Sequence, residues 1–204
     1  GDAYSETYGL VNLSSCTCAL GDVDSAQNAA LQARELARQI GDQSAEAWAL
    51  TGLGHSYLAA GDHKKAFDAY RGALQIRQML EQPLLATEPA AGLATLALDQ
   101  EDLETASRYI EMVLPVMEQK QGLNGTDDPL RVYLACYRVL AAKNDPAAGD
   151  VLQTAYELIL SRASNIPREE SRQAFLENIH HHREILSAWK SMQNSPVSIR
   201  QTKI

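Results

Sequence analysis

The strongest constraint on the fold is a short helix-breaking pair of residues that recurs along the chain. The pairs Gly21-Asp22, Gly61-Asp62 and Glu101-Asp102 are each 40 residues apart, and Asn144-Asp145 follows 43 residues later. Each pair lies between two stretches with apolar residues at helical spacing. Gly or Asn closes a helix in the left-handed conformation, and the Asp side chain then caps the next helix. The pattern therefore predicts a series of helical hairpins.

The positions around these pairs repeat as well. Eight residues before each pair lie Leu13, Leu53, Leu93 and Cys136. Five residues after its first member lie small side chains, which let two helices approach closely: Ala26, Ala66, Ala106 and Gly149. We therefore predict an all-α fold in which residues 1–164 form about four hairpins, at about 4–40, 43–80, 84–121 and 127–164.

The C-terminal part predicts a single closing helix. Asn165-Ile166-Pro167 is a capped helix start, and the apolar residues after it recur on one face. We assign residues 165–192 to a capping helix, because a helical array must cover its end with one apolar and one polar face. Residues 193–204 have no helical pattern, and we expect an extended tail that docks on another surface.

Charge and composition limit the possible functions. The chain has 204 residues, 45% of them hydrophobic, and a net charge of −8. A surface of this sign repels phosphate backbones, so we expect no direct nucleic-acid binding. We find no apolar run long enough to span a membrane. Cys16 and Cys18 point to different faces of a helix, which favours free thiols in a reducing, cytoplasmic environment.

No catalytic motif is present, and we expect neither an enzyme nor a cofactor. The best metal-binding candidate is the run from His180 to His182, where His181 shares one helical face with Glu177 and Glu184. Structural and catalytic metal sites usually combine ligands from several elements, together with groups that orient them. We therefore interpret this cluster as a solvated helix face and predict no metal site.

The second hairpin carries a family resemblance. It reads Leu50-x-x-Leu53-Gly54-x-x-Tyr57, followed by Gly61-Asp62, Ala66, Tyr70 and Ala73. This resembles the tetratricopeptide repeat, with Leu50 in place of the family's Trp, longer helices and a late or absent Pro. The resemblance implies a right-handed α–α superhelix, a solenoid without catalytic activity that binds a protein or peptide in a concave groove.

The same resemblance implies which residues face the groove. These are Tyr8, Asn12 and Ser15 in the first hairpin, Trp48, Thr51 and His55 in the second, Glu88 and Thr95 in the third, and Arg131, Leu134 and Arg138 in the fourth. Our predicted contact set is Tyr8, Asn12, Trp48, Thr51, His55, Thr95, Arg131 and Arg138. Arg131 and Arg138 lie two turns apart on one face, so they can clamp an acidic group. Salt bridges to an adjacent hairpin are an equally good interpretation of the two arginines.

Residues 85–190 are also similar to a more specific group of proteins. The phrases from Glu88 to Ala94, Asp128 to Tyr133 and Phe175 to Ile179 resemble the C-terminal helical repeats of bacterial STAND-class signal-transduction ATPases and transcriptional regulators. The resemblance implies a sensor or scaffold module that contacts a partner or upstream domains of its own chain. The alternatives are a free-standing adaptor, a scaffold that self-associates through its apolar N-terminal hairpin, and, least favoured, a metal-dependent enzyme.

Overall fold

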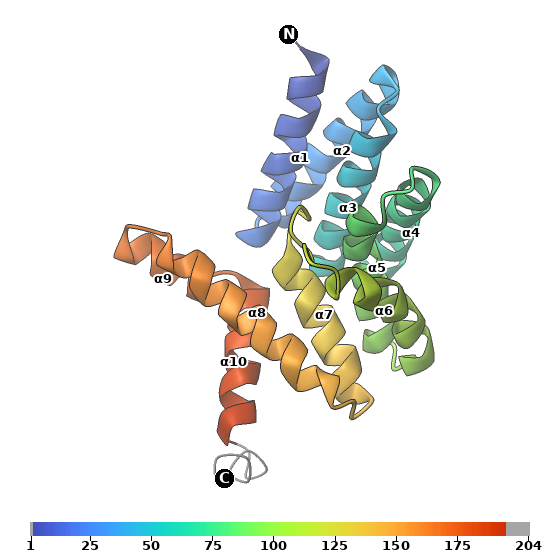
Figure 1. Ribbon diagram of the computed structural model, residues 1–204. Helices are drawn as coiled ribbons and strands as arrows, with labels where there is room; N and C mark the ends of the chain where they lie inside the picture. Colours follow the sequence, from blue (N-terminus) through green and yellow to red (C-terminus); the bar gives the residue numbers. More distant parts are fainter. Residues whose placement is uncertain (1, 195–204) are drawn as a thin grey trace.

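The computed structural model describes residues 2–194, and the regular structure in this range is helical (Figure 1). This confirms the all-α, tetratricopeptide-like hairpin architecture. The helices are α1 (Ala3–Ala19), α2 (Val23–Ile40), α3 (Gln43–Ala59), α4 (His63–Met79), α5 (Pro83–Asp99), α6 (Leu103–Met117), α7 (Pro129–Ala142), α8 (Ala147–Ser164), α9 (Glu169–Glu177) and α10 (His180–Asn194).

The turns between the first six helices share one geometry and recur every 20 residues. At each turn a residue with positive φ closes the helix: Gly21, Gly41, Gly61, Glu81 and Glu101. The next backbone N–H then bonds back to the last helical turn, as from Asp62 to the carbonyl of Tyr57 at 2.9 Å. This is the Schellman pattern, which satisfies carbonyls that the helix end leaves free. The turns within hairpins and the turns between them are therefore alike.

Aspartate side chains cap most of these helices at the start, as the sequence predicted. Asp22, Asp62 and Asp102 each accept a hydrogen bond from the backbone N–H three residues later, at 3.0–3.1 Å. Asp42 and Asp128 cap α3 and α7 in the same way. A cap of this kind stabilises a helix by about 1 kcal/mol.

The repeated apolar positions form the core between successive hairpins. Ala26, Ala66 and Ala106 are completely buried. Leu53 and Leu93 are 2% and 1% exposed, whereas Leu13, at the same position in the first hairpin, is 50% exposed. The difference follows from stacking, since α3 and α5 pack against the hairpin before them and α1 has no such neighbour among the described residues.

A long connection separates the third hairpin from the fourth. The helix α6 ends at Met117, four residues before the predicted end of its hairpin, and the chain reaches α7 through a turn-rich segment. Leu123 anchors this segment in the core, and Asp127 accepts a hydrogen bond from Ser15 of α1 at 2.8 Å. The connection therefore ties the fourth hairpin to the first helix.

The prediction of one long capping helix is wrong. The chain breaks at Asn178 and Ile179 and forms α9 and α10 instead. A break exposes backbone carbonyls, and two side chains of α10 satisfy them. His182 Nδ1 lies 2.7 Å from the Phe175 carbonyl, and Arg183 Nη1 donates to the Glu177 carbonyl at 2.7 Å.

The last three helices depart from the regular stack. In Figure 1, α8 and α9 reach out to one side of the molecule and α10 runs away from them. The last two residues of α10, at positions 193 and 194, were predicted to belong to the tail. The rest of the predicted tail, residues 195–204, lies outside the described residues.

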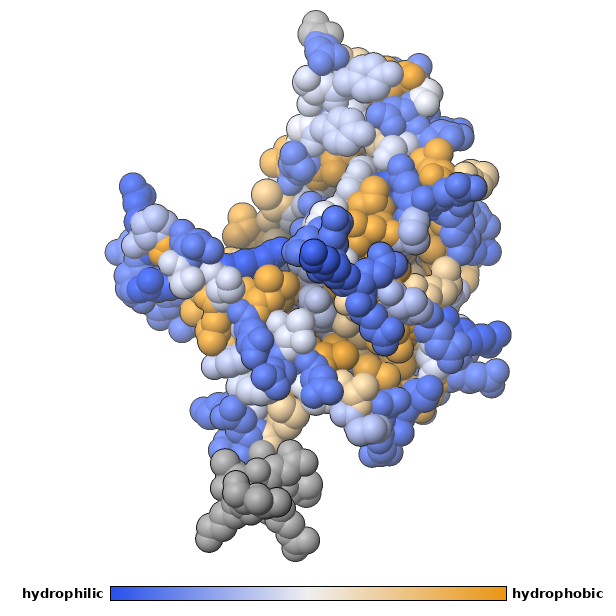
Figure 2. Space-filling view, viewed as in Figure 1, coloured by the Kyte–Doolittle hydropathy of each residue, from blue (hydrophilic) through white to orange (hydrophobic). Residues whose placement is uncertain are grey.

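The surface is mainly polar. In the view of Figure 2, hydrophilic residues cover most of the molecule, and hydrophobic residues reach the surface in several separate patches. None of the helices in residues 2–194 combines the length and the apolar composition that crossing a membrane requires.

Candidate functional site

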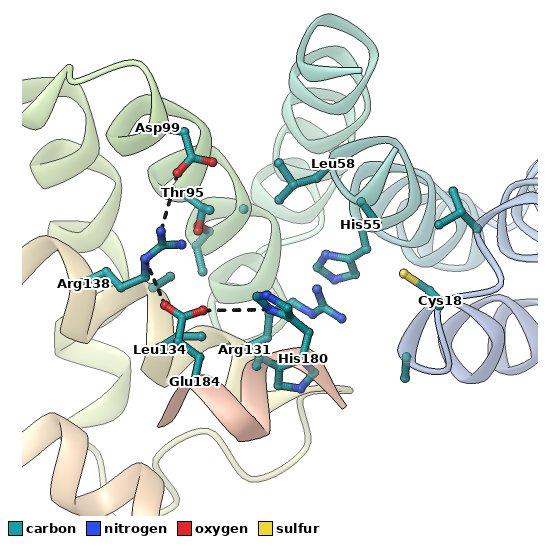
Figure 3. Close-up of a pocket in the computed structure, with 18 of the residues that line it drawn as sticks. Cys18, His55, Leu58, Thr95, Asp99, Arg131, Leu134, Arg138, His180 and Glu184 are labelled. Atoms are coloured by element: carbon teal, nitrogen blue, oxygen red, sulfur yellow. Dashed lines mark hydrogen bonds and ion pairs between the residues drawn. The ribbon is translucent and has the colours of Figure 1, made fainter. Parts of the chain in front are cut away.

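A pocket of about 580 Å³ lies between the first helices of the hairpins and the start of α10 (Figure 3). We call it the central pocket. Its walls come from the α1–α2 turn, α3, α4, α5, α7 and α10. Its volume falls in the range of small-molecule and peptide-anchor sites. Apolar side chains such as Leu58 and Leu134 alternate with charged ones along its walls.

A buried chain of three polar side chains joins α3, α4 and α5 at this pocket. His55 Nδ1 lies 2.6 Å from the Tyr70 hydroxyl, and His55 Nε2 lies 2.8 Å from Glu88 Oε1. Burial lowers the pKa of His55 well below its usual value, so the ring is neutral near pH 7. The neutral ring then accepts from Tyr70 and donates to Glu88.

Glu88 is an unusually placed carboxyl group. It is 3% exposed, and its Oε2 atom has no hydrogen-bond partner among the described residues. Burial raises its pKa to about 7, because a charged carboxylate loses its hydration there. Glu88 therefore exchanges a proton close to neutral pH.

Two glycines make room for the Tyr70 ring. A Cβ atom on Gly54 would lie 2.4 Å from the ring, and one on Gly92 would lie 2.5 Å from it. Both distances are far inside van der Waals contact. Because Gly54 on α3 and Gly92 on α5 have no side chain, the Tyr70 ring of α4 fits between these helices and reaches His55.

A second polar cluster crosses from α7 to α10. Arg131 Nε lies 3.4 Å from Asp128 Oδ2, and His181 Nε2 lies 2.9 Å from the same oxygen. Burial by itself would raise the pKa of Asp128, but the hydrogen bond and charge of His181, together with the charge of Arg131, hold it well below its usual range. Asp128 is therefore an anion that caps α7 and holds the start of α10.

Arg138 bridges two elements at the other side of the central pocket. Its Nη2 atom lies 3.7 Å from Asp99 Oδ1 on α5, and its Nε atom lies 3.4 Å from Glu184 Oε1 on α10. Figure 3 shows this pair of contacts as dashed lines. The alternative interpretation of Arg138, a salt bridge to an adjacent hairpin, is thus realised in the contact with Asp99.

The structure brings four of the eight predicted contact residues together. His55, Thr95, Arg131 and Arg138 all line the central pocket. The other four lie elsewhere in the first two hairpins. They are Tyr8, whose hydroxyl donates to Asp42, the exposed Asn12, Trp48, whose ring stacks on Arg77, and Thr51, which is buried and bonded to the Ala47 carbonyl.

Sequence reasoning missed three residues that shape the pocket. Tyr70 and Asp128 are not among the predicted contact residues, and His181 was predicted to lie on a solvated helix face. This last prediction is wrong, since His181 is 6% exposed and His182 is buried as well. One signal was available for the buried polar chain: Glu88 is the only charged residue in the apolar stretch from 83 to 98.

The His180–His182 run does not form a ligand set with its neighbours. His181 pairs with Asp128, and Glu184 pairs with Arg138, so the two side chains are engaged in different contacts. Within residues 2–194, no three His, Cys, Asp or Glu side chains are placed to share a metal ion.

Comparison with known proteins identifies the repeat. Residues 5–79 match the family model of the tetratricopeptide repeat, a stretch that covers α1 to α4. The tetratricopeptide prediction is thereby confirmed for the first two hairpins. None of the curated proteins compared with the chain matches it. Repeats of this family generally mediate contacts between proteins and are typically non-catalytic.

Proposed function

We propose that this chain is an interaction module that holds a segment of a partner protein in the central pocket. The observation that carries the proposal is the convergence of His55, Thr95, Arg131 and Arg138 on one pocket. These residues come from three different hairpins, and the repeat resemblance implies that all of them face one groove. The match of residues 5–79 to the tetratricopeptide repeat supports an interaction role rather than a chemical one.

The chemistry of the pocket favours an acidic partner. Arg131, Arg138 and Arg183 line it, together with two exposed imidazoles, two buried imidazoles and two carboxylates. The chain as a whole carries a net charge of −8, so this cationic concentration is local. An acidic segment would be repelled by the rest of the surface and attracted here, which gives the contact its specificity.

The wider resemblance supports a place for the module in signalling. Residues 85–190 are similar to the helical repeats that follow the ATPase of STAND-class regulators. We propose further that the module is the sensor of such an ATPase or transcriptional regulator, which lies in the same chain or in another. A free-standing adaptor is the alternative, and it uses the same pocket.

A pull-down with matched charge variants tests the proposal. The double variant Arg131→Gln with Arg138→Gln should lose a partner that the unaltered chain captures from the source cell. The control is Arg71→Gln with Arg108→Gln, which removes the same charge from side chains that are 56% and 66% exposed outside the pocket. Equal capture by both double variants would refute binding in the central pocket.

A second candidate function, self-association, is favoured by the open face of the first hairpin. Leu13 and Leu20 are 50% and 74% exposed, and Cys16 beside them is exposed as well. At the positions equivalent to Leu13 in the later hairpins, the side chains are buried. Light scattering on the purified chain tests this function: a dimer that Leu13→Asp converts to a monomer would support it, and a monomer at all concentrations would refute it.

A further inference from the structure

Arg131 differs from the other arginines of the central pocket in what its end group contacts. Its Nε atom pairs with Asp128, but neither terminal amino group has a hydrogen-bond or ion-pair partner in residues 2–194. Arg138, in contrast, pairs with two carboxylates, and Arg183 donates to backbone carbonyls. Arg131 therefore has free donors at the pocket wall.

The surroundings of these donors fit a carboxylate on a short aliphatic stem. A guanidinium group presents a planar fork that matches the two oxygens of a carboxylate. Leu58, Leu134, Ala91 and Ala135 supply apolar walls around the same space. An acidic side chain, or a small organic acid, would place its charge on Arg131 and its methylene groups against these walls.

The His55–Glu88 pair lies behind this position. Arg131 acts electrostatically on both members of the pair, as does Asp128. His55 and Tyr70 line the pocket themselves, whereas Glu88 lies beneath them. The other titratable or charged groups that act on this buried chain come from five elements: Cys18 on α1, Arg77 on α4, Asp127 and Asp128 before α7, Arg131 on α7, and His181 on α10.

The geometry points to a proton-linked carboxylate site. We infer that Arg131 anchors a carboxylate group of the partner, and that the carboxylate enters together with one proton from solvent, which the buried His55–Glu88 pair retains. The inference rests on the proposed function and names the chemical group that the pocket recognises.

The physical reason is charge balance in a poorly hydrated space. A bound carboxylate adds a negative charge near Glu88, whose Oε2 atom has no hydrogen-bond partner among residues 2–194. Two carboxylates that share such a space do not both remain ionised near neutral pH. Because burial already places the pKa of Glu88 at about 7, the incoming charge raises it further and the pair takes up a proton.

The sign of the pH dependence follows from this uptake. Below pH 7 the pair already carries the proton in the free protein, so binding requires no proton uptake by the pair. Above pH 7 binding must draw a proton from solvent. The affinity for a carboxylate then falls, by up to about tenfold for each pH unit when one proton is taken up.

Three other imidazoles face the pocket. They belong to His63 on α4 and to His180 and His181 on α10. Their effect on anion binding is the same in the unaltered chain and in the Glu88→Gln variant. The difference between these two proteins therefore isolates the contribution of Glu88.

The test uses two carboxylate probes and one neutral match. The probes are N-acetyl-Leu-Glu-Leu-amide and glutarate, and the match is N-acetyl-Leu-Gln-Leu-amide. Their dissociation constants are measured by NMR titration at pH 6, 7 and 8 in four proteins: the unaltered chain, Arg131→Gln, Glu88→Gln and the surface control Arg71→Gln. Circular dichroism verifies that each variant is folded.

We expect the carboxylate probes to bind and the neutral peptide not to bind. Arg131→Gln should abolish the binding, and Arg71→Gln should leave it unchanged. From pH 7 to pH 8 the dissociation constant should rise by up to about tenfold in the unaltered chain and stay level in Glu88→Gln. Tighter binding of the peptide identifies the ligand as a protein side chain, and tighter binding of glutarate identifies a free organic acid.

Two results would overturn the inference. If neither carboxylate probe binds at pH 6, Arg131 is not a carboxylate site. If the probes bind with the same pH dependence in Glu88→Gln as in the unaltered chain, no proton is held by the buried pair. Neither result decides the proposed function, because the pull-down measures capture of a whole partner by the pocket arginines.

Discussion

At the scale of single residues, the Tyr70 ring is seated between two helical glycines from different hairpins. Glycine in a helix interior normally costs about 1 kcal/mol relative to alanine. Here Gly54 and Gly92 offset that cost by admitting an aromatic ring whose hydroxyl completes the buried chain to His55 and Glu88. The local propensity is thus overridden by a packing requirement that the sequence of one helix does not show.

Gly54→Ala should therefore destabilise the protein by about 1–3 kcal/mol, because the new methyl group would overlap the Tyr70 ring. Gly72→Ala is the matched control. A Cβ there would lie 3.4 Å from Leu50, an ordinary contact, and we expect the higher helix propensity of alanine to stabilise the protein by up to about 1 kcal/mol. Urea denaturation of both variants checks the prediction, which fails if the two changes have the same sign.

Glu88→Gln should change the pH dependence of stability. The folded-state pKa of Glu88 is raised from 4.5 to about 7, so the folded chain binds more protons than the unfolded chain between these values. Glu88 therefore lowers the free energy of unfolding as pH rises from about 4.5 to about 7. Relative to the unaltered chain, Glu88→Gln should gain stability from pH 5 to pH 7, by at most about 3 kcal/mol, and level off above it.

Denaturation curves of both proteins at pH 5, 6, 7 and 8 measure this difference. The comparison between variants matters because His55 has the opposite effect. Burial lowers its pKa, so it favours the fold as pH rises towards 6.5 and masks part of the Glu88 effect in the unaltered chain. A difference that does not vary with pH would contradict the assigned proton exchange at Glu88.

At the scale of elements, the break between α9 and α10 depends on side chains that replace lost backbone hydrogen bonds. His182 contacts the Phe175 carbonyl through Nδ1 and packs against the Phe175 ring, with centroids 4.4 Å apart. Arg183, which is exposed, donates hydrogen bonds to the carbonyls of Glu177 and Asn178. The buried member of the pair should carry most of the energy, because its partner carbonyl has less access to water.

His182→Ala should loosen α9 without disturbing the hairpins. We expect the backbone amides of α9 to exchange with deuterium at least tenfold faster, which corresponds to about 1.4 kcal/mol of local stability. The amides of α3 to α5 should keep their rates. Arg183→Ala is the control and should have the smaller effect, since water can satisfy the exposed carbonyls. Equal effects of the two variants would argue against this account of the break.

The elements were predictable to the extent that local rules decide them. The Asp caps of α2, α4 and α6 and the left-handed glycines at 21 and 61 follow from residue type. The break at 178 was not predictable, because its compensation comes from His182 and Arg183 in the next helix. The buried chain was not predictable either, since His55, Tyr70 and Glu88 come from three helices and meet only after stacking.

At the scale of the whole molecule, the array is a stack in which each hairpin packs against its neighbours. Residues at equivalent positions of different hairpins therefore differ in burial according to whether a neighbouring hairpin packs against them. Leu53 and Leu13 occupy the same position in consecutive hairpins, yet one is 2% exposed and the other 50%. The first hairpin presents to solvent the face that every later hairpin buries.

Leu53→Ala should consequently destabilise the protein by about 2–5 kcal/mol, because it opens a cavity between two hairpins. Leu13→Ala removes the same atoms from a half-exposed site and should change the free energy of unfolding by less than about 1 kcal/mol. Thermal and urea denaturation compare the pair directly. Similar losses would mean that the face of the first hairpin is covered in solution, which would favour self-association.

The central pocket is bounded by the turn after α1 on one side and by the start of α10 on the other. These two walls belong to opposite ends of the stacked array, and each contact between hairpins contributes a small rotation to the angle between them. The array is therefore an elastic superhelix, and its two ends both contribute to the pocket. Stretching the array would move the two walls apart. A ligand that contacts both walls would oppose this movement and stiffen the array.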